Sequence, residues 1–371
     1  MSWKVDVAEC MINIIFIILF LFGLILPRMF KKIYLCIILL LLGLLSYNII
    51  PDTTSDLYRH LMFYDETVKY GFDYVFRSHY MKSVPIYALF IAALSFFKNE
   101  KIVPLIVYLL TYIPLIMCIY KKCEKQNKKY FAYILTMFIL FCISFNGAIS
   151  GVRNMCSFSL FVVILYLELE KTIPQLIAFL LYIVLGFFHN SIFILIIIRF
   201  LIEFPTKKII SILLVTWPIA LAFLSPIISL LSKIMPVFGI LSDSFISYTS
   251  SNHYSSLGVM IFRALILLIS IMILGDDKIR HKRNKFVKFY YYVFLFTISS
   301  IIQYDVFVRF CQLLVMMFPF VFLEVVEERK IVKKSIYKKK ELIYLSVIML
   351  TMFLSVCFLI WSEYTKLNFF V

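Results

Sequence analysis

Four groups of polar residues could carry out chemistry in an otherwise apolar chain. The first is a helical face within segment 52–60, formed by an i, i+4, i+7, i+8 spacing: Asp52, Asp56, Arg59 and His60. A carboxylate beside a guanidinium and an imidazole can bind phosphate and transfer protons. The same residues also fit a solvated surface helix with an ordinary ion pair. Both interpretations stay open.

The second and third groups stand at the ends of apolar runs. Arg153 and Asn154 open one run, and an arginine inside a membrane is costly unless it faces a polar cavity. Snorkelling of the side chain to the membrane surface is the plainer alternative. His189 and Asn190 lie where two apolar runs meet without a charged linker. A histidine there is either a catalyst with a polar neighbour or a structural hydrogen-bonding residue.

The fourth group is the turn between two late apolar runs, which contains Tyr304, Asp305 and Arg309. Asp305 and Arg309 are four residues apart, so they can pair on a helix. An arginine held by a carboxylate is also suited to gripping phosphate. Arg263, about one turn into its own apolar run, is a further candidate cation, although snorkelling explains it nearly as well.

The composition indicates what kind of structure must position these groups. Hydrophobic residues make up 63% of the 371 residues and charged residues only 16%, whereas about a quarter of a soluble domain is charged. Mean hydropathy is +0.97. The chain is therefore predicted to be an integral membrane protein. The net charge of +16 gathers in short loops between apolar runs, as in cytoplasmic loops of membrane proteins, so nucleic acid is not an expected partner.

The apolar runs are long enough to cross a membrane as helices. They predict an all-α polytopic chain with about 12 transmembrane helices that forms one domain over residues 1–371. Run 84–97 is too short to cross and is expected to be re-entrant or interfacial. The predicted spans are 10–27, 33–50, 102–120, 130–147, 153–169, 172–188, 190–204, 209–230, 258–274, 288–303, 307–323 and 342–362.

The alternation of basic loops predicts the orientation of these spans. When the basic loops lie inside, the loops 51–83 and 231–257 lie outside. The four polar groups and Arg263 then fall on that same outer side. Several arginines and carboxylates in one outer site suggest an anionic, lipid-linked substrate that enters from the outer leaflet.

Several common kinds of site are not expected. The eight cysteines form no C-x-x-C pair and most lie in apolar runs, so neither a disulfide nor a zinc site is predicted. The sequence contains no G-x-x-x-x-G-K-[ST] phosphate loop, no G-x-G-x-x-G and no H-E-x-x-H. We therefore expect no cofactor and no metal site, and leave a divalent metal open because no ligand set can be named.

Three segments follow one another in a characteristic order: Pro51-Asp52…Asp56-Leu57-Tyr58-Arg59-His60, Ser150-Gly151-Val152-Arg153-Asn154 and Phe187-Phe188-His189-Asn190-Ser191. In this order they resemble the EpsG family of Wzy-like bacterial polysaccharide polymerases, and Arg309 also fits. The resemblance covers about residues 45–325. The chain lacks the Arg-x10-Gly repeat of other Wzy proteins, so the detailed site of those enzymes is not carried over.

The resemblance implies a glycosyltransferase with a GT-C-like helical architecture in the bacterial cytoplasmic membrane. It would join repeat units carried on undecaprenyl pyrophosphate into capsule, exopolysaccharide or O-antigen chains on the outer face. The implied partners are this lipid-linked glycan, the lipid bilayer and other polysaccharide assembly proteins. An O-antigen ligase-like transferase and a non-enzymatic flippase or transporter remain alternatives.

With this function, each candidate residue has an expected role. Arg153 and Arg309 are expected to neutralise the departing pyrophosphate, with Arg59 as a third candidate. Asp56 or His189 is the candidate base. Asp52 and Asp305 would orient their neighbours. The remaining candidates for substrate contact are His60, Asn154, Asn190, Tyr304 and Arg263.

Overall fold

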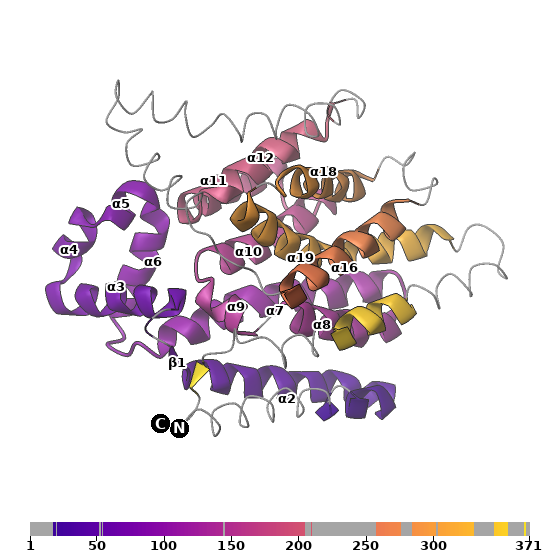
Figure 1. Cartoon of the computed structure of the whole chain (residues 1–371), viewed down its shortest axis with the longest axis horizontal. Helices are drawn as coiled ribbons and strands as arrows, with labels where there is room; N and C mark the ends of the chain where they lie inside the picture. The colour runs from indigo at the N-terminus through magenta and orange to yellow at the C-terminus, as the bar shows by residue number, and fades with distance from the viewer. Residues whose placement is uncertain are drawn as a thin grey trace. The chain divides into compact units, whose positions relative to one another are not determined.

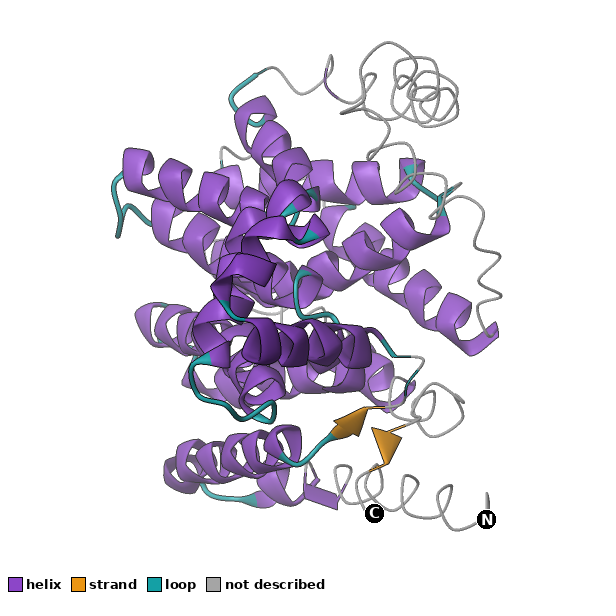
Figure 2. Cartoon of the chain, turned by 90° about the vertical axis from the view of Figure 1, so that its left-hand side faces the viewer, coloured by secondary structure: helices purple, strands orange, loops and turns teal. Residues whose placement is uncertain are grey.

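The part of the chain described by the structure, a computed structural model, is almost entirely helical (Figures 1 and 2). Two short strands, β1 (Ile50–Pro51) and β2 (Leu367–Asn368), pair antiparallel. The predicted all-α class is confirmed. The described residues are 18–19, 21–51, 53, 55–143, 145–204, 209, 257–275, 284–301, 303–329, 345–354 and 367–368.

The chain divides into two compact units: unit 1 (Met1–Ile194 with Val315–Val371) and unit 2 (Leu195–Leu314). The helices within unit 1 include α2 (Arg28–Tyr47), α3 (Asp56–Tyr70), α4 (Phe72–Arg77), α5 (His79–Ser83), α6 (Pro85–Ser95), α7 (Ile102–Lys125), α8 (Lys129–Cys142), α9 (Phe145–Ser150), α10 (Asn154–Leu169) and α11 (Gln175–Phe188). Unit 2 contains α16 (Leu257–Leu274) and α18 (Lys285–Ser299). Two helices begin in one unit and end in the other, α12 (Ser191–Leu201) and α19 (Tyr304–Arg329).

Among the described residues, three helices are long and apolar enough to cross a membrane: Met29–Tyr47, Ile102–Lys125 and Asp305–Glu327. Shorter apolar helices accompany them. These helices support a membrane protein, whereas the larger predicted number of spans stays a prediction. Seven predicted segments lie wholly or partly outside the described residues: 10–27, 51–83, 130–147, 209–230, 231–257, 288–303 and 342–362.

The helix expected over 130–147 is shorter than predicted. Helix α8 ends at Cys142, Ile143 is extended, and the chain continues as the separate short helix α9. Gly147 and Gly151 lie in this stretch, and glycine is a poor helix former. The break leads directly to Arg153, which precedes the first residue of α10. A second break, between the end of α9 at Ser150 and the start of α10 at Asn154, therefore contains the candidate site residue Arg153.

Helix α6 fills the place of the short apolar run 84–97. It begins at Pro85, in the first turn where proline is tolerated, and its 11 residues extend over about 16 Å. Such a length is well below the roughly 30 Å of a hydrocarbon core. Helix α6 packs against α3, α5 and α11, so it lies within a group of helices from residues far apart in sequence.

Helix α7 is the element around which unit 1 is organised. It contacts α2, α8, α9 and α10. Tyr112 donates a hydrogen bond to the carbonyl of Ile143 at 3.1 Å, next to the break after α8. Ser159 of α10 donates to the carbonyl of Thr111 on α7. These buried bonds hold the segment around Arg153 against the first half of α7.

Candidate functional site

Helix α3 brings His60 inward. The helix begins after Ser55, whose side chain accepts a hydrogen bond from the backbone N–H of Tyr58 at 3.2 Å. It ends at Gly71, whose φ of 74° suits glycine. Between these ends the buried side chains follow helical spacing, with Leu57, His60 and Leu61 on the inner stripe. His60 is therefore part of the packed face of α3.

His60 bonds to a tyrosine of α6. Its Nδ1 lies 2.6 Å from the hydroxyl oxygen of Tyr87, and both residues are buried. Burial, with smaller contributions from the charges of Arg153 and Arg59, lowers the pKa of the His60 imidazole to about 3. The imidazole is thus neutral near pH 7, and its bond with Tyr87 fixes both rings. His60 can orient Tyr87 but does not supply a positive charge.

Arg153 lies against two tyrosine rings. Its guanidinium carbon is 5.5 Å from the ring centre of Tyr80, on α5, and 5.4 Å from that of Tyr87, on α6. A cation over an aromatic face is attracted by the ring quadrupole. No carboxylate among the described residues forms a salt bridge with Arg153. The side chain is half-buried, so a positive charge is held at this point by rings and can attract an anion.

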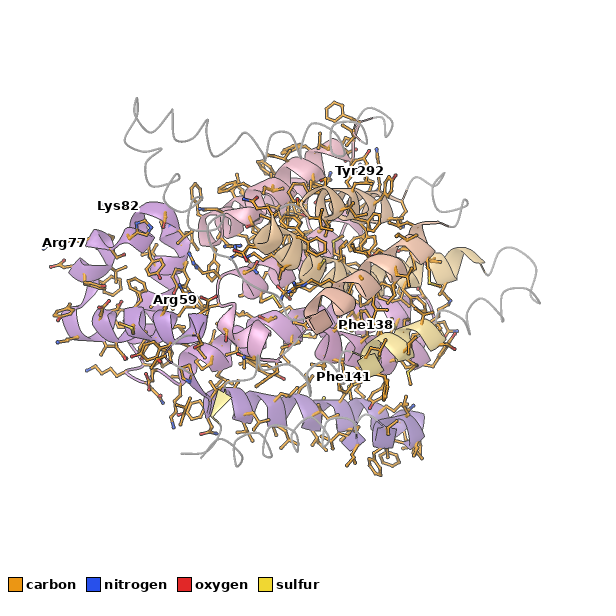
Figure 3. All side chains as sticks on the ribbon, viewed as in Figure 1. Arg59, Arg77, Lys82, Phe138, Phe141 and Tyr292 are labelled. Carbon is orange, nitrogen blue, oxygen red and sulfur yellow. The ribbon has the colours of Figure 1, made fainter. Side chains whose placement is uncertain are left out.

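Two charged neighbours of His60 on α3, Asp56 and Arg59, are exposed. Asp56 and Arg59 form an ion pair, and their side chains are 56% and 68% exposed (Arg59 is labelled in Figure 3). Asp56 and His60 are four residues apart on a regular helix and so share a face with Arg59, as expected, but His60 lies at the buried edge of that face and the other two side chains lie at its exposed edge. This geometry fits the surface ion pair that the sequence also allowed. Asp52, the fourth member of the group, lies outside the described residues.

His189 ends α11 close to the same rings. Its ring centre is 6.0 Å from that of Phe158 on α10, and the side chain is buried. The neighbouring Phe188 packs edge-on against Tyr87 with ring centres 5.8 Å apart. The structure therefore brings two predicted site segments, those of His60 and His189, into contact with Tyr87.

The asparagines of these segments differ. Asn190 is exposed, whereas Asn154 is half-buried and its Oδ1 atom is inaccessible. This oxygen accepts no hydrogen bond within the described part of the chain. The serines next to Arg153 on α10 serve the backbone instead, since Ser157 donates to the Arg153 carbonyl at 2.6 Å.

The remaining candidates lie in unit 2. Tyr304, Asp305 and Arg309 occupy the first turns of α19, and the side chains of Asp305 and Arg309 are half-buried. Arg263 is half-buried on α16. Their assignment to the same substrate as Arg153 stays a prediction. No group of three or more His, Cys, Asp or Glu side chains that could hold a metal ion occurs among the described residues.

A second charged cluster lies at the C-terminal end of α7. Lys122 is only 4% exposed and pairs with Glu324 of α19 and with Glu170, the latter at 3.5 Å. Lys125 pairs with Glu170 as well, and Gln126 donates to Glu327. The sequence placed these lysines in a basic loop, but Lys122 belongs to α7 and is buried between helices. We call Lys122, Glu170 and Glu324 the lysine cluster.

Residues 31–369 match the EpsG family, over nearly the whole chain. The chain belongs to the EpsG family. This confirms the resemblance found in the sequence, and because EpsG is a family of Wzy-like polysaccharide polymerases, it indicates a polysaccharide polymerase role. No curated protein and no solved structure matches the chain.

The sequence did not reveal the two tyrosines that hold Arg153 in this EpsG protein. Run 84–97 was interpreted only by its length, although Tyr87 is one of the few residues in α6 with a hydrogen-bonding side chain. A tyrosine inside a short apolar run that follows a polar outer segment is the signal that could have identified it. Tyr80 offers no comparable signal, since it stands in a mixed polar segment.

Proposed function

We propose that this EpsG protein joins lipid-linked oligosaccharide repeat units into a surface polysaccharide on the outer face of the bacterial cytoplasmic membrane. The donor would carry undecaprenyl pyrophosphate, and the fold would be GT-C-like with about 12 spans. The observation that supports the proposal best is the environment of Arg153, which lies between Tyr80 and Tyr87 without a carboxylate partner among the described residues.

The reaction forms a glycosidic bond between the acceptor oxygen and the anomeric carbon of the donor sugar, and it breaks the bond from that carbon to the lipid pyrophosphate. Undecaprenyl pyrophosphate leaves, so negative charge grows on this leaving group. A guanidinium offers a planar fork of N–H donors that matches two phosphate oxygens at once. Stabilisation of this kind acts where the charge develops, and it is stronger in a partly buried place than in water. Arg153 meets these requirements, and no internal carboxylate seen in the described residues competes with the substrate.

The acceptor hydroxyl must be oriented and must lose its proton. We place the base at His189 or Asp56, as the sequence suggested. The structure supports His189 better, because it is buried beside Phe158 and follows Phe188, which packs on Tyr87. Asp56 is exposed and already paired with Arg59. His60 is neutral and orients Tyr87, so it would act through the position of Arg153.

Analysis of lipid-linked glycans in a strain that lacks the gene tests this function. We expect single repeat units to accumulate on the lipid at the outer face and long chains to disappear. Units trapped on the inner face would instead indicate a flippase. Full-length chains that remain unattached would indicate a ligase. Complementation with the wild-type gene controls for effects on neighbouring genes.

A further inference from the structure

A row of aromatic rings leads away from Arg153. The guanidinium lies over Tyr80, whose ring centre is 4.7 Å from that of Phe63. Phe63 is followed by Tyr74 at 6.0 Å and Tyr74 by Tyr70 at 5.8 Å. We call Tyr80, Phe63, Tyr74 and Tyr70 the aromatic track. It connects helices α5, α3 and α4, which lie together in Figure 1.

The aromatic track runs from the site to the protein surface. Phe63 is only 3% exposed and forms the base of the row. Tyr80 and Tyr74 are half-buried, and Tyr70 is 57% exposed. The rings of Tyr80, Tyr74 and Tyr70 are therefore accessible to a ligand, whereas Phe63 lies buried between them and supports them from the inside.

Local structure keeps the rings in place. Gly71 turns the chain between α3 and α4 with a positive φ, and this turn brings Tyr74 back against Phe63. The Tyr74 hydroxyl donates a hydrogen bond to Glu66, eight residues earlier on α3. The Lys69 ammonium lies 5.0 Å from the ring centre of Tyr70. With Arg153 over Tyr80, each of the three tyrosines thus has a polar or charged partner that limits its motion.

We propose that the aromatic track binds the saccharide chain whose pyrophosphate-linked end lies at Arg153. This inference rests on the proposed function and adds to it the path of the sugar chain. A sugar ring has an apolar C–H face and a rim of hydroxyl groups, and tyrosine matches it with an apolar ring and a polar tip. Three of the four residues are tyrosines, which suits a saccharide better than a lipid tail.

The test is the length of the polymer made by cells that carry Tyr70→Ala or Tyr74→Ala. Loss of one ring contact should weaken chain binding by about two- to tenfold, so the chain is released earlier. We expect the most frequent chain length to fall by about twofold or more, while repeat units are still joined. Tyr70→Phe keeps the stacking ring and loses only the polar tip, so it should shorten the chains less than Tyr70→Ala does.

Phe76→Ala is the matched control. Phe76 is 55% exposed, close to the value for Tyr70, and it packs on Phe72 outside the aromatic track. Immunoblots of the membrane fraction check that each variant reaches the wild-type amount. Wild-type chain length in Tyr70→Ala at normal protein amount would overturn the proposal. So would an equal shortening in Phe76→Ala.

Arg153→Lys in the same strain separates the two proposals. If the polymerase function is correct and the track is not, Arg153→Lys still loses polymer while the tyrosine variants keep wild-type chain length. If the polymerase function itself is wrong, single repeat units do not accumulate on the outer face in the deletion strain.

Discussion

Two cationic side chains of unit 1, Arg153 and Lys122, differ in burial and in their carboxylate partners. Lys122 is almost fully buried and is paired with the carboxylates of Glu324 and Glu170. Arg153 is half-buried between tyrosine rings and has no carboxylate partner among the described residues. Both cations also contact aromatic rings, since Lys122 lies 5.3 Å from the ring centre of Tyr166. The presence of carboxylates is therefore what distinguishes them.

This difference indicates different roles for the two sites. A buried ion pair that loses one member leaves an uncompensated charge, which destabilises the fold. The lysine cluster joins α7 to α19 and to the end of α10, so its charges are used within the protein. The charge of Arg153 is satisfied only by ring faces in the described structure. We therefore expect substitutions to affect folding at Lys122 and polymerisation at Arg153.

The largest expected effect is on the stability of Lys122→Met. Glu324 would be left without its main cation, at a cost of about 3–5 kcal/mol, and the amount of protein in the membrane should fall sharply. The double variant Lys122→Met with Glu324→Met removes both charges and should recover much of the protein. Recovery would be measured by immunoblot and by thermal unfolding in detergent. A stable Lys122→Met single variant would show that the lysine cluster is not a structural ion pair.

The next largest effect is expected on the polymerisation rate of Tyr87→Phe, because Tyr87 contacts both histidine segments. Tyr87→Phe keeps the ring beside Arg153 but removes the hydroxyl that bonds to His60, at a cost of about 1–3 kcal/mol. Polymerisation should drop by about tenfold, since the ring and the guanidinium lose their fixed position. Tyr80→Phe keeps its ring and loses no side-chain hydrogen bond seen in the described part of the chain, so it should be close to wild type. Equal polymerisation rates in both variants would show that the His60–Tyr87 hydrogen bond does not contribute to polymerisation.

A smaller effect is expected on the pH dependence of stability, to which His60 contributes. Below its ordinary pKa of 6.5 the unfolded chain takes up a proton, whereas the buried imidazole stays neutral until its pKa of about 3. Stability should therefore fall as the pH drops below 6.5, by up to about 1.4 kcal/mol for each pH unit. The His60→Gln variant should show a smaller difference in melting temperature between about pH 7.5 and pH 5. An identical difference in both proteins would mean that His60 is accessible to protons.

The smallest effect is expected for Asp56→Asn. Asp56 and Arg59 form an exposed pair, and such pairs contribute about 0–1 kcal/mol. We expect nearly wild-type polymerisation, equal to that of Asp65→Asn, whose carboxylate lies further along the same helix. If Asp56→Asn alone nearly abolishes polymerisation in a purified assay, Asp56 is the base, because an amide cannot accept the proton.

The sequence predicted the helical class, the membrane character and the family, because these depend on composition and on short motifs. It also selected Arg153, His60 and His189, whose segments meet around one tyrosine in the structure. It could not predict that Tyr87 joins them, since contacts between distant helices depend on packing that a linear pattern does not contain. For the same reason the burial of Lys122 was missed, because a lysine near a helix end looks the same whether it is solvated or paired.

Rates of repeat-unit joining by purified proteins in lipid test the central claim most directly. Arg153→Lys keeps the charge but loses the two-pronged grip on phosphate, so its rate per folded molecule should fall by about 100-fold or more. The Lys122→Met, Glu324→Met double variant should join repeat units at nearly the wild-type rate per folded molecule. A wild-type rate in Arg153→Lys would contradict the account, and Arg153 would then be a structural residue like Lys122.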